Sequence, residues 1–221
     1  MAEAGTGGAA AYSIVVPRGF VRAETPPERG AATAGDVDPA AWRDFQQMRA
    51  RLSELDSPGE LEAFVLDAFV TAGRVPGIGA TGSLIVTIVP TVPSPAADLD
   101  ALLLARVARG GRPLVVGHES AVAWDSVSGQ DAPAGDENVM RRRTVLARVA
   151  GSDHLLASFT LTLISPHASA DLGSAPSPGP HGPDSETEAV ADALVELFDA
   201  MMTTVRWLDE QGRVITDRPT T

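Results

Sequence analysis

Apolar residues recur every three or four positions in four stretches of the chain, the spacing that places them on one side of an α-helix. These stretches predict helices over residues 38–55, 58–72, 96–109 and 185–211, each opened by a Ser or Asp with a nearby Pro or Glu. In the third helix the apolar positions cover more than half of the circumference, so we expect it to be well buried. The fourth is the longest and carries a wide apolar stripe.

Short β-branched runs and alternation of apolar and polar residues indicate strands between and after these helices. They are expected within residues 12–24, 84–92, 114–127, 139–150 and 155–164. Gly117 breaks the third of these segments, and residues 151–153 join the last two as a hairpin. One face of the last strand is wholly apolar and is predicted to be core: Leu155, Ala157, Phe159, Leu161 and Leu163.

The order of these elements predicts one α+β domain over residues 12–211. We expect an α/β/α sandwich, with a twisted, mainly antiparallel sheet and the long C-terminal helix packed across one face. Residues 1–11 and 212–221 are predicted to be tails, and the Ser-, Pro- and Gly-rich residues 166–184 a disordered insertion loop. A chain of 221 residues is long enough for one sizeable core.

Charge narrows the range of partners. The chain carries 29 acidic and 17 basic residues, a net charge of −12, which disfavours nucleic acid. The single basic run is Arg141, Arg142 and Arg143, in a predicted strand where Arg142 points to the opposite face from the other two. Arg141 and Arg143 are either a solvated strand face or a contact for an anionic partner. All basic residues are Arg, a composition typical of a GC-rich, actinobacterial-like genome.

Several classes of site are disfavoured. The chain has no Cys, so disulfides, thiolate nucleophiles and iron–sulfur clusters are excluded. The four His residues lack the spacing of a metal pair, and we predict no metal and no cofactor. Because neither a signal peptide nor a run of about 18 apolar residues is present, the expected location is the cytoplasm, with no membrane span.

Two motifs suggest chemistry and compete with plainer interpretations. Residues 77–82 match the letters of the dinucleotide fingerprint, but a helix is expected before them and a strand after them, the reverse of what the motif requires. A surface loop is favoured, with Ile78 as a candidate contact residue. His118 beside Glu119 is a candidate general base. No nucleophile accompanies it at fixed spacing, so an enzyme is the least favoured hypothesis.

The last helix offers two candidate binding features. Met201 and Met202 favour core packing, but together with Phe159 they could line a lipid-like ligand pocket between sheet and helix. Trp207 lies off the main apolar stripe near the predicted end of the helix. We expect it to be partly exposed and to be a candidate interface anchor.

Two segments carry a resemblance to a known fold family. Residues 12–20, ending in Pro17-Arg18-Gly19-Phe20, are similar to the strand and Pro-x-Gly-Trp turn of the Mog1/PsbP-like fold, and residues 198–206 are similar to its closing helix. The strand and helix within residues 84–109 also fit. Phe20 in place of tryptophan and the insertion at residues 166–184 depart from the pattern.

The resemblance implies a role in binding. Members of this group include photosystem extrinsic subunits, a Ran-GTPase-binding protein and actinobacterial lipoproteins, and most act by binding a protein. We therefore predict a non-enzymatic binding or adaptor protein with an unidentified protein partner, or one that forms a homo-oligomer. Its candidate surface comprises Ile78, Arg141, Arg143 and Trp207. The alternative is the lipid-like ligand pocket, and the third hypothesis is an enzyme that uses His118 and Glu119.

Overall fold

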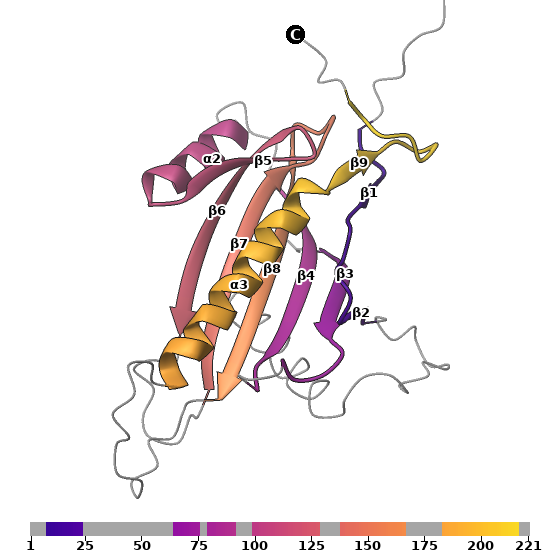
Figure 1. Ribbon diagram of the computed structural model, residues 1–221. Helices are drawn as coiled ribbons and strands as arrows, with labels where there is room; N and C mark the ends of the chain where they lie inside the picture. Colours follow the sequence, from indigo (N-terminus) through magenta and orange to yellow (C-terminus); the bar gives the residue numbers. More distant parts are fainter. Residues whose placement is uncertain are drawn as a thin grey trace, which may run out of the picture.

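The chain forms a twisted antiparallel sheet with a helix on each face (Figure 1). The computed structural model describes residues 8–23, 64–75, 79–91, 99–128, 138–166 and 183–216. In chain order its elements are β1 (Ala11–Ser13), β2 (Phe20–Arg22), β3 (Phe64–Thr71), β4 (Thr81–Pro90), α2 (Leu99–Ala108), β5 (Arg112–Val116), β6 (Glu119–Ser128), β7 (Asn138–Arg148), β8 (Leu155–Pro166), α3 (Pro183–Thr203) and β9 (Arg206–Leu208). The predicted α+β class with a mainly antiparallel sheet is confirmed.

Seven strands form the main sheet in the order β2-β3-β4-β8-β7-β6-β5, and β1 pairs with β9 in a separate two-stranded ribbon. Each strand pair is antiparallel. The hairpin that joins β7 to β8 is where the sequence predicts it, at Gly151. Neither helix that the structure describes is long and apolar enough to cross a membrane.

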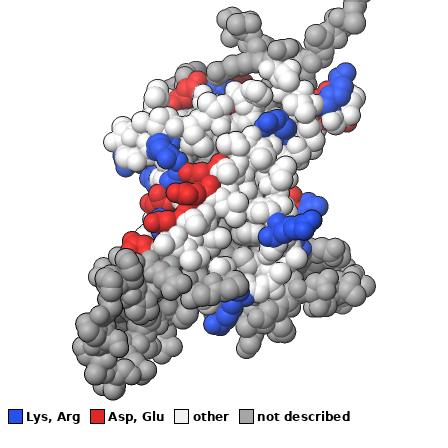
Figure 2. All heavy atoms as spheres, viewed as in Figure 1, with Lys and Arg blue, Asp and Glu red and all other residues white. Residues whose placement is uncertain are grey.

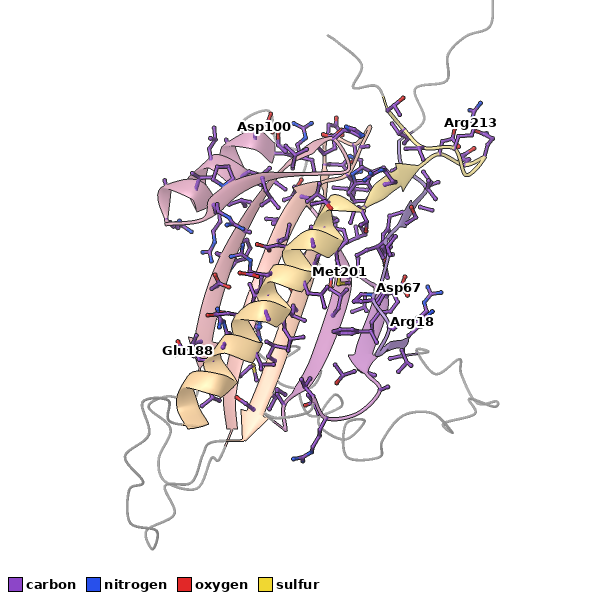
Figure 3. All side chains as sticks on the ribbon, in the orientation of Figure 1. Arg18, Asp67, Asp100, Glu188, Met201 and Arg213 are labelled. Atoms are coloured by element: carbon purple, nitrogen blue, oxygen red, sulfur yellow. The ribbon has the colours of Figure 1, made fainter. Side chains whose placement is uncertain are left out.

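The main core lies between α3 and one face of the sheet. Phe198, Met201 and Met202 of α3 pack there on strand residues such as Val145 and Phe159, and Figure 3 shows Met201 on the sheet side of α3. The apolar face of β8 is confirmed as core, because Ala157, Phe159, Leu161 and Leu163 all belong to this cluster. A fully buried Phe contributes up to about 3 kcal/mol relative to leaving it exposed.

The second helix packs on the opposite face of the sheet. Leu99 and Leu103 of α2 contact Val122 of β6 and Leu156 of β8. Both strand residues precede or follow a main-core residue by one position, so strand geometry places them on the other face. We refer below to the α3 face and the α2 face of the sheet.

The predicted helix over residues 58–72 is wrong where it can be compared, because residues 64–71 form strand β3. Its residues are apolar on both faces: Phe69 packs toward the main core, whereas Ala68 and Val70 belong to a cluster on the other side. A strand that is buried on both faces loses the alternation that distinguishes it from a helix. Residues 57–63 and the predicted helix over residues 38–55 lie outside the described residues.

The C-terminal helix was predicted to reach residue 211, but α3 ends at Thr203. The hydroxyls of Thr203 and Thr204 donate to the carbonyls of Ala200 and Met201, which is typical of residues that compete with continued helix. The chain then becomes strand β9, and Tyr12 of β1 lies opposite Trp207. A pairing partner almost two hundred residues away overrides the local helical spacing.

The break predicted at Gly117 is a two-residue hairpin turn between β5 and β6. Gly117 has φ 57° and His118 has φ 71°, the left-handed values of a type I′ turn. The Trp207 ring lies directly against Gly117, so a Cβ added there would be 2.7 Å from the ring atoms Cδ1 and Nε1. This contact joins the β1/β9 ribbon to the main sheet.

Replacing Gly117 with alanine is therefore expected to lower the free energy of unfolding by about 3 kcal/mol, since left-handed strain costs about 1–2 kcal/mol and overpacking about 1–3 kcal/mol. Gly110 supplies the control, because its φ is also positive, at 92°, but a Cβ there meets nothing within 4 Å. Gly110→Ala should cost only about 1 kcal/mol. Urea unfolding measures both, and equal losses would show that the Trp207 contact carries no energy.

Candidate functional site

Arg141 and Arg143 lie on the α3 face, where the structure uses them internally. Arg143 donates from Nε and Nη2 to Asp199 on α3, at 3.1 and 2.9 Å, and from Nη1 to Asp125 on β6, at 2.8 Å. Arg141 donates to Asp192 of α3 at 2.6 Å. Figure 2 shows the acidic side chains gathered beside α3. The solvated-face interpretation is wrong for Arg143, whose side chain is 7% exposed. A contact role for Arg141 stays a prediction.

Trp207 is also buried rather than partly exposed. Its exposed fraction is 2%, and it lies in strand β9 instead of a helix. The prediction of partial exposure is wrong because it assumed that residue 207 is helical. In the strand that forms instead, the Trp207 side chain points toward the core. Its indole Nε1 is buried and has no hydrogen-bond partner in the described ranges. Trp207 therefore supports the fold.

The glycine-rich segment joins two strands. β3 precedes it and β4 follows it from Thr81, so the expected strand after the motif is confirmed and the helix expected before it is wrong. Gly79 donates to the carbonyl of Val75 and closes the connection. Ile78 lies outside the described residues, so its role as a contact stays a prediction.

The structure separates His118 from Glu119. His118 is exposed at the hairpin turn, whereas Glu119 is 6% exposed. The Glu119 carboxylate lies 3.8 Å from the Nε atom of Arg148, which also pairs with Asp100 of α2 at 3.0 Å. Glu119 therefore forms part of the link between α2 and the sheet. Among the described residues, no group of three or more His, Asp and Glu side chains could hold a metal ion.

A second carboxylate, Asp67 of β3, joins three strands. It accepts a hydrogen bond from the hydroxyl of Tyr12 at 2.8 Å and another from Arg22 of β2. Burial and the bond to Asp67 raise the pKa of Tyr12 above its usual range. The hydroxyl therefore stays protonated and acts as a donor, which makes this cluster a structural link.

Met201, Met202 and Phe159 are all at most 5% exposed and belong to the main core. The core-packing interpretation of the two methionines is confirmed. The lipid-like ligand pocket that they could line stays a prediction.

Helix α2 departs most clearly from the prediction. It was expected to be well buried, but only Leu99 and Leu103 of its residues are buried. Leu102 is 43% exposed and Leu104 65%, and Val115 on the neighbouring strand β5 is 65% exposed. Figure 2 shows a largely uncharged surface over α2, with basic side chains where the helix ends. An apolar circumference wider than one buried stripe is the sequence signal for such a second surface.

Val115 faces the same side of the sheet as α2. Pro113, two residues earlier in β5, lies opposite Val122, and Val122 packs on α2. Positions 113 and 115 share a strand face. Val115 thus lies on the α2 side of edge strand β5. Leu102 and Leu104 are two residues apart in α2, so they lie on opposite flanks of the buried Leu103. We call Leu102, Leu104 and Val115 together the α2/β5 surface.

Arg142 lies on the α2 face, which confirms the prediction that it points away from Arg141 and Arg143. Its neighbours across the strands are Thr162 of β8 and Ser126 of β6. Its Nε atom is buried without a hydrogen-bond partner, as is the hydroxyl of Thr162. The alternation along the strand predicts the sheet face to which Arg142 points. It does not predict that Arg142 lacks a hydrogen-bond partner among the described residues, because this depends on the residues of the neighbouring strands.

No protein-family model matches the chain, and neither a curated protein nor a solved structure matches it. The resemblance to the Mog1/PsbP-like fold family stays a prediction.

Proposed function

We propose that the chain is a non-enzymatic binding protein that docks a partner protein on the α2/β5 surface. The observation that carries this proposal is the exposure of Leu104 and Val115, each 65%, beside Leu102 at 43%. Single exposed apolar residues are ordinary, but Leu102 and Leu104 flank the buried stripe of α2 on both sides, so the proposed partner covers the exposed half of this helix. The α/β/α sandwich and the Mog1/PsbP-like resemblance support the proposal by analogy, since most members of that group bind proteins.

The partner is expected to bind through side chains rather than by adding a strand to the sheet. β5 is the last strand of the sheet, so its outer edge is free among the described strands. Pro113 lacks an N–H, however, and proline in an edge strand discourages further pairing. The binding energy would therefore come from burial of the three apolar side chains.

A charged residue near the α2/β5 surface indicates which charges we expect beside the apolar patch of the partner. Arg109 is exposed just after α2. It adds a positive charge near the end of this helix in a chain whose net charge is −12. A partner surface whose apolar anchors are flanked by Asp or Glu would complement Arg109 and would associate faster at low salt.

Leu104→Asp is expected to weaken partner binding about thirtyfold, because losing a central apolar anchor costs about 2 kcal/mol at an interface. Leu197→Asp is the matched control, since Leu197 is an exposed leucine at 38% on the other helix, α3. Tagged full-length wild-type and variant chains would first be used to identify a copurifying protein. Its affinity would then be measured with purified components.

Retained affinity in Leu104→Asp, or an equal loss in Leu197→Asp, would exclude the α2/β5 surface as the docking site. Sedimentation of the wild-type chain alone tests the homo-oligomer alternative. If self-association is found and Leu104→Asp abolishes it, a second copy of the chain is the partner.

A further inference from the structure

Two unpartnered polar groups lie side by side in the middle of the sheet. The Nε atom of Arg142 and the hydroxyl of Thr162 are buried and have no hydrogen-bond partner among the described residues. The two residues lie directly opposite each other on β7 and β8, so their side chains share one face and start about 5 Å apart. Buried polar groups are usually satisfied in folded proteins. Other buried atoms of the described residues, such as Arg148 Nε and Trp207 Nε1, also lack a hydrogen-bond partner there, but Arg142 and Thr162 form a facing pair on adjacent strands and are therefore a candidate ligand position.

Arg142 differs from the other arginines of its strand. Arg141, Arg143 and Arg148 each pair with a carboxylate. Within the part of the chain that the structure describes, the Arg142 guanidinium has only a weak contact, from Nη2 to the Met140 sulfur at 3.9 Å. A guanidinium cannot lose its proton under ordinary conditions, so it cannot relieve its burial by becoming neutral.

The surroundings of Arg142 form a row of hydroxyl groups across four strands. Ser83 of β4 lies opposite Thr162, and Ser126 of β6 lies opposite Arg142, all on the α2 face. Thr144 lies two residues along β7 on the same face. The row contains hydroxyls and one cation, and no carboxylate.

Exposure increases along this row toward β6. Ser83 is 3% exposed and Thr162 1%, whereas Arg142 is half-buried and Ser126 is exposed. A ligand could therefore approach from the β6 side and reach Arg142 before Thr162. The next row on the same face holds Met140 opposite Ile164, which offers apolar contact beside the polar groups.

We propose that Arg142 and Thr162 bind the carboxylate group of a small, partly apolar organic acid. The planar guanidinium matches a carboxylate through two donors, and the Thr162 hydroxyl supplies a further donor. One fixed positive charge balances one carboxylate. A phosphate near −2 would leave charge unbalanced in a half-buried site of an acidic protein. The site is separate from the α2/β5 surface, and each proposal can fail without the other.

Isothermal titration of the full chain with octanoate tests the site, with octan-1-ol as the uncharged control and inorganic phosphate as the dianion. We expect saturable octanoate binding with a Kd of about 1 mM or below. Arg142→Met should weaken it at least about tenfold, which corresponds to losing one charge-assisted contact. Arg142→Lys should keep part of the affinity because it retains the charge. Arg141→Met, on the same strand but the opposite face, should leave it unchanged.

Thr162→Val separates a binding effect from a folding failure. It removes the unpartnered hydroxyl and keeps the side-chain shape, so the melting temperature should hold or rise by about 2–4 °C. Octanoate affinity should nevertheless fall several-fold, whereas Thr162→Ser should retain it.

In the nuclear magnetic resonance spectrum, the Arg142 Nε–H signal should shift on adding octanoate. The proposal is overturned by the absence of octanoate binding, by equal binding of octan-1-ol, by tighter binding of phosphate, or by unchanged affinity in Arg142→Met.

Discussion

Replacing Trp207 with alanine is expected to lower the free energy of unfolding by about 4 kcal/mol, near the top of the range for core truncations. Trp207 is 2% exposed, belongs to the main core and lies against Gly117. Its loss would leave a large void where the β1/β9 ribbon meets the β5/β6 turn. Urea unfolding followed by far-ultraviolet circular dichroism measures the change without relying on the tryptophan signal.

Trp207→Phe is the control that identifies what the side chain contributes. The indole Nε1 has no hydrogen-bond partner among the residues that the structure describes, so phenylalanine loses ring volume but no bond seen there. We expect a change within about 1.5 kcal/mol. If phenylalanine costs as much as alanine, the contribution does not come from filling space. In the Trp207→Ala variant, the Gly117→Ala substitution should no longer cause overpacking, because the indole ring is gone. A double-mutant cycle would show this as a smaller destabilisation by Gly117→Ala in that variant than in the wild type.

The strands of the central sheet could be predicted because their sequence signals are local. In β8 the alternation of Phe159 and Leu161 with Thr160 and Thr162 gives both the strand and its core face. The Gly117 turn follows equally from the conformational freedom of glycine. These elements need no knowledge of distant neighbours.

The failures have a shared physical cause, since each depends on contacts between distant parts of the chain. Phe69 and Val70 of β3 face opposite clusters, which hides the strand period. Trp207 is in a strand because β1 pairs with it, and Leu104 is exposed because α2 has one packed side only. Spacing cannot report such long-range pairings.

The candidate sites show the same division. The sequence predicts that Arg142 and Arg143 point in opposite directions, and strand register confirms it. The position at which α3 crosses the sheet decides which arginine pairs with a carboxylate. In the structure, α3 places Asp199 over Arg143. The predicted contact residue Arg143 is therefore internal, whereas a contact role for Arg141 stays a prediction.

Asp199→Asn is expected to destabilise the fold by about 3 kcal/mol, because it leaves a buried cation poorly compensated. Asp199 accepts two hydrogen bonds from Arg143 and also pairs with Arg112. After the substitution Arg143 would keep only Asp125, whose side chain is 45% exposed. The remaining attraction would therefore be screened by water, whereas the Arg143 side chain would stay 7% exposed.

Asp192→Asn provides the matched control on the same helix. Asp192 is 56% exposed and pairs only with Arg141 among the described residues, so its loss should cost less than about 1 kcal/mol. Urea unfolding at low and at high salt distinguishes the two positions. The Asp199 effect should persist at about 1 M salt, where interactions of exposed charges are largely screened, and the Asp192 effect should vanish. Equal effects at both positions would show that burial of Arg143 does not set the strength of this link between α3 and the sheet.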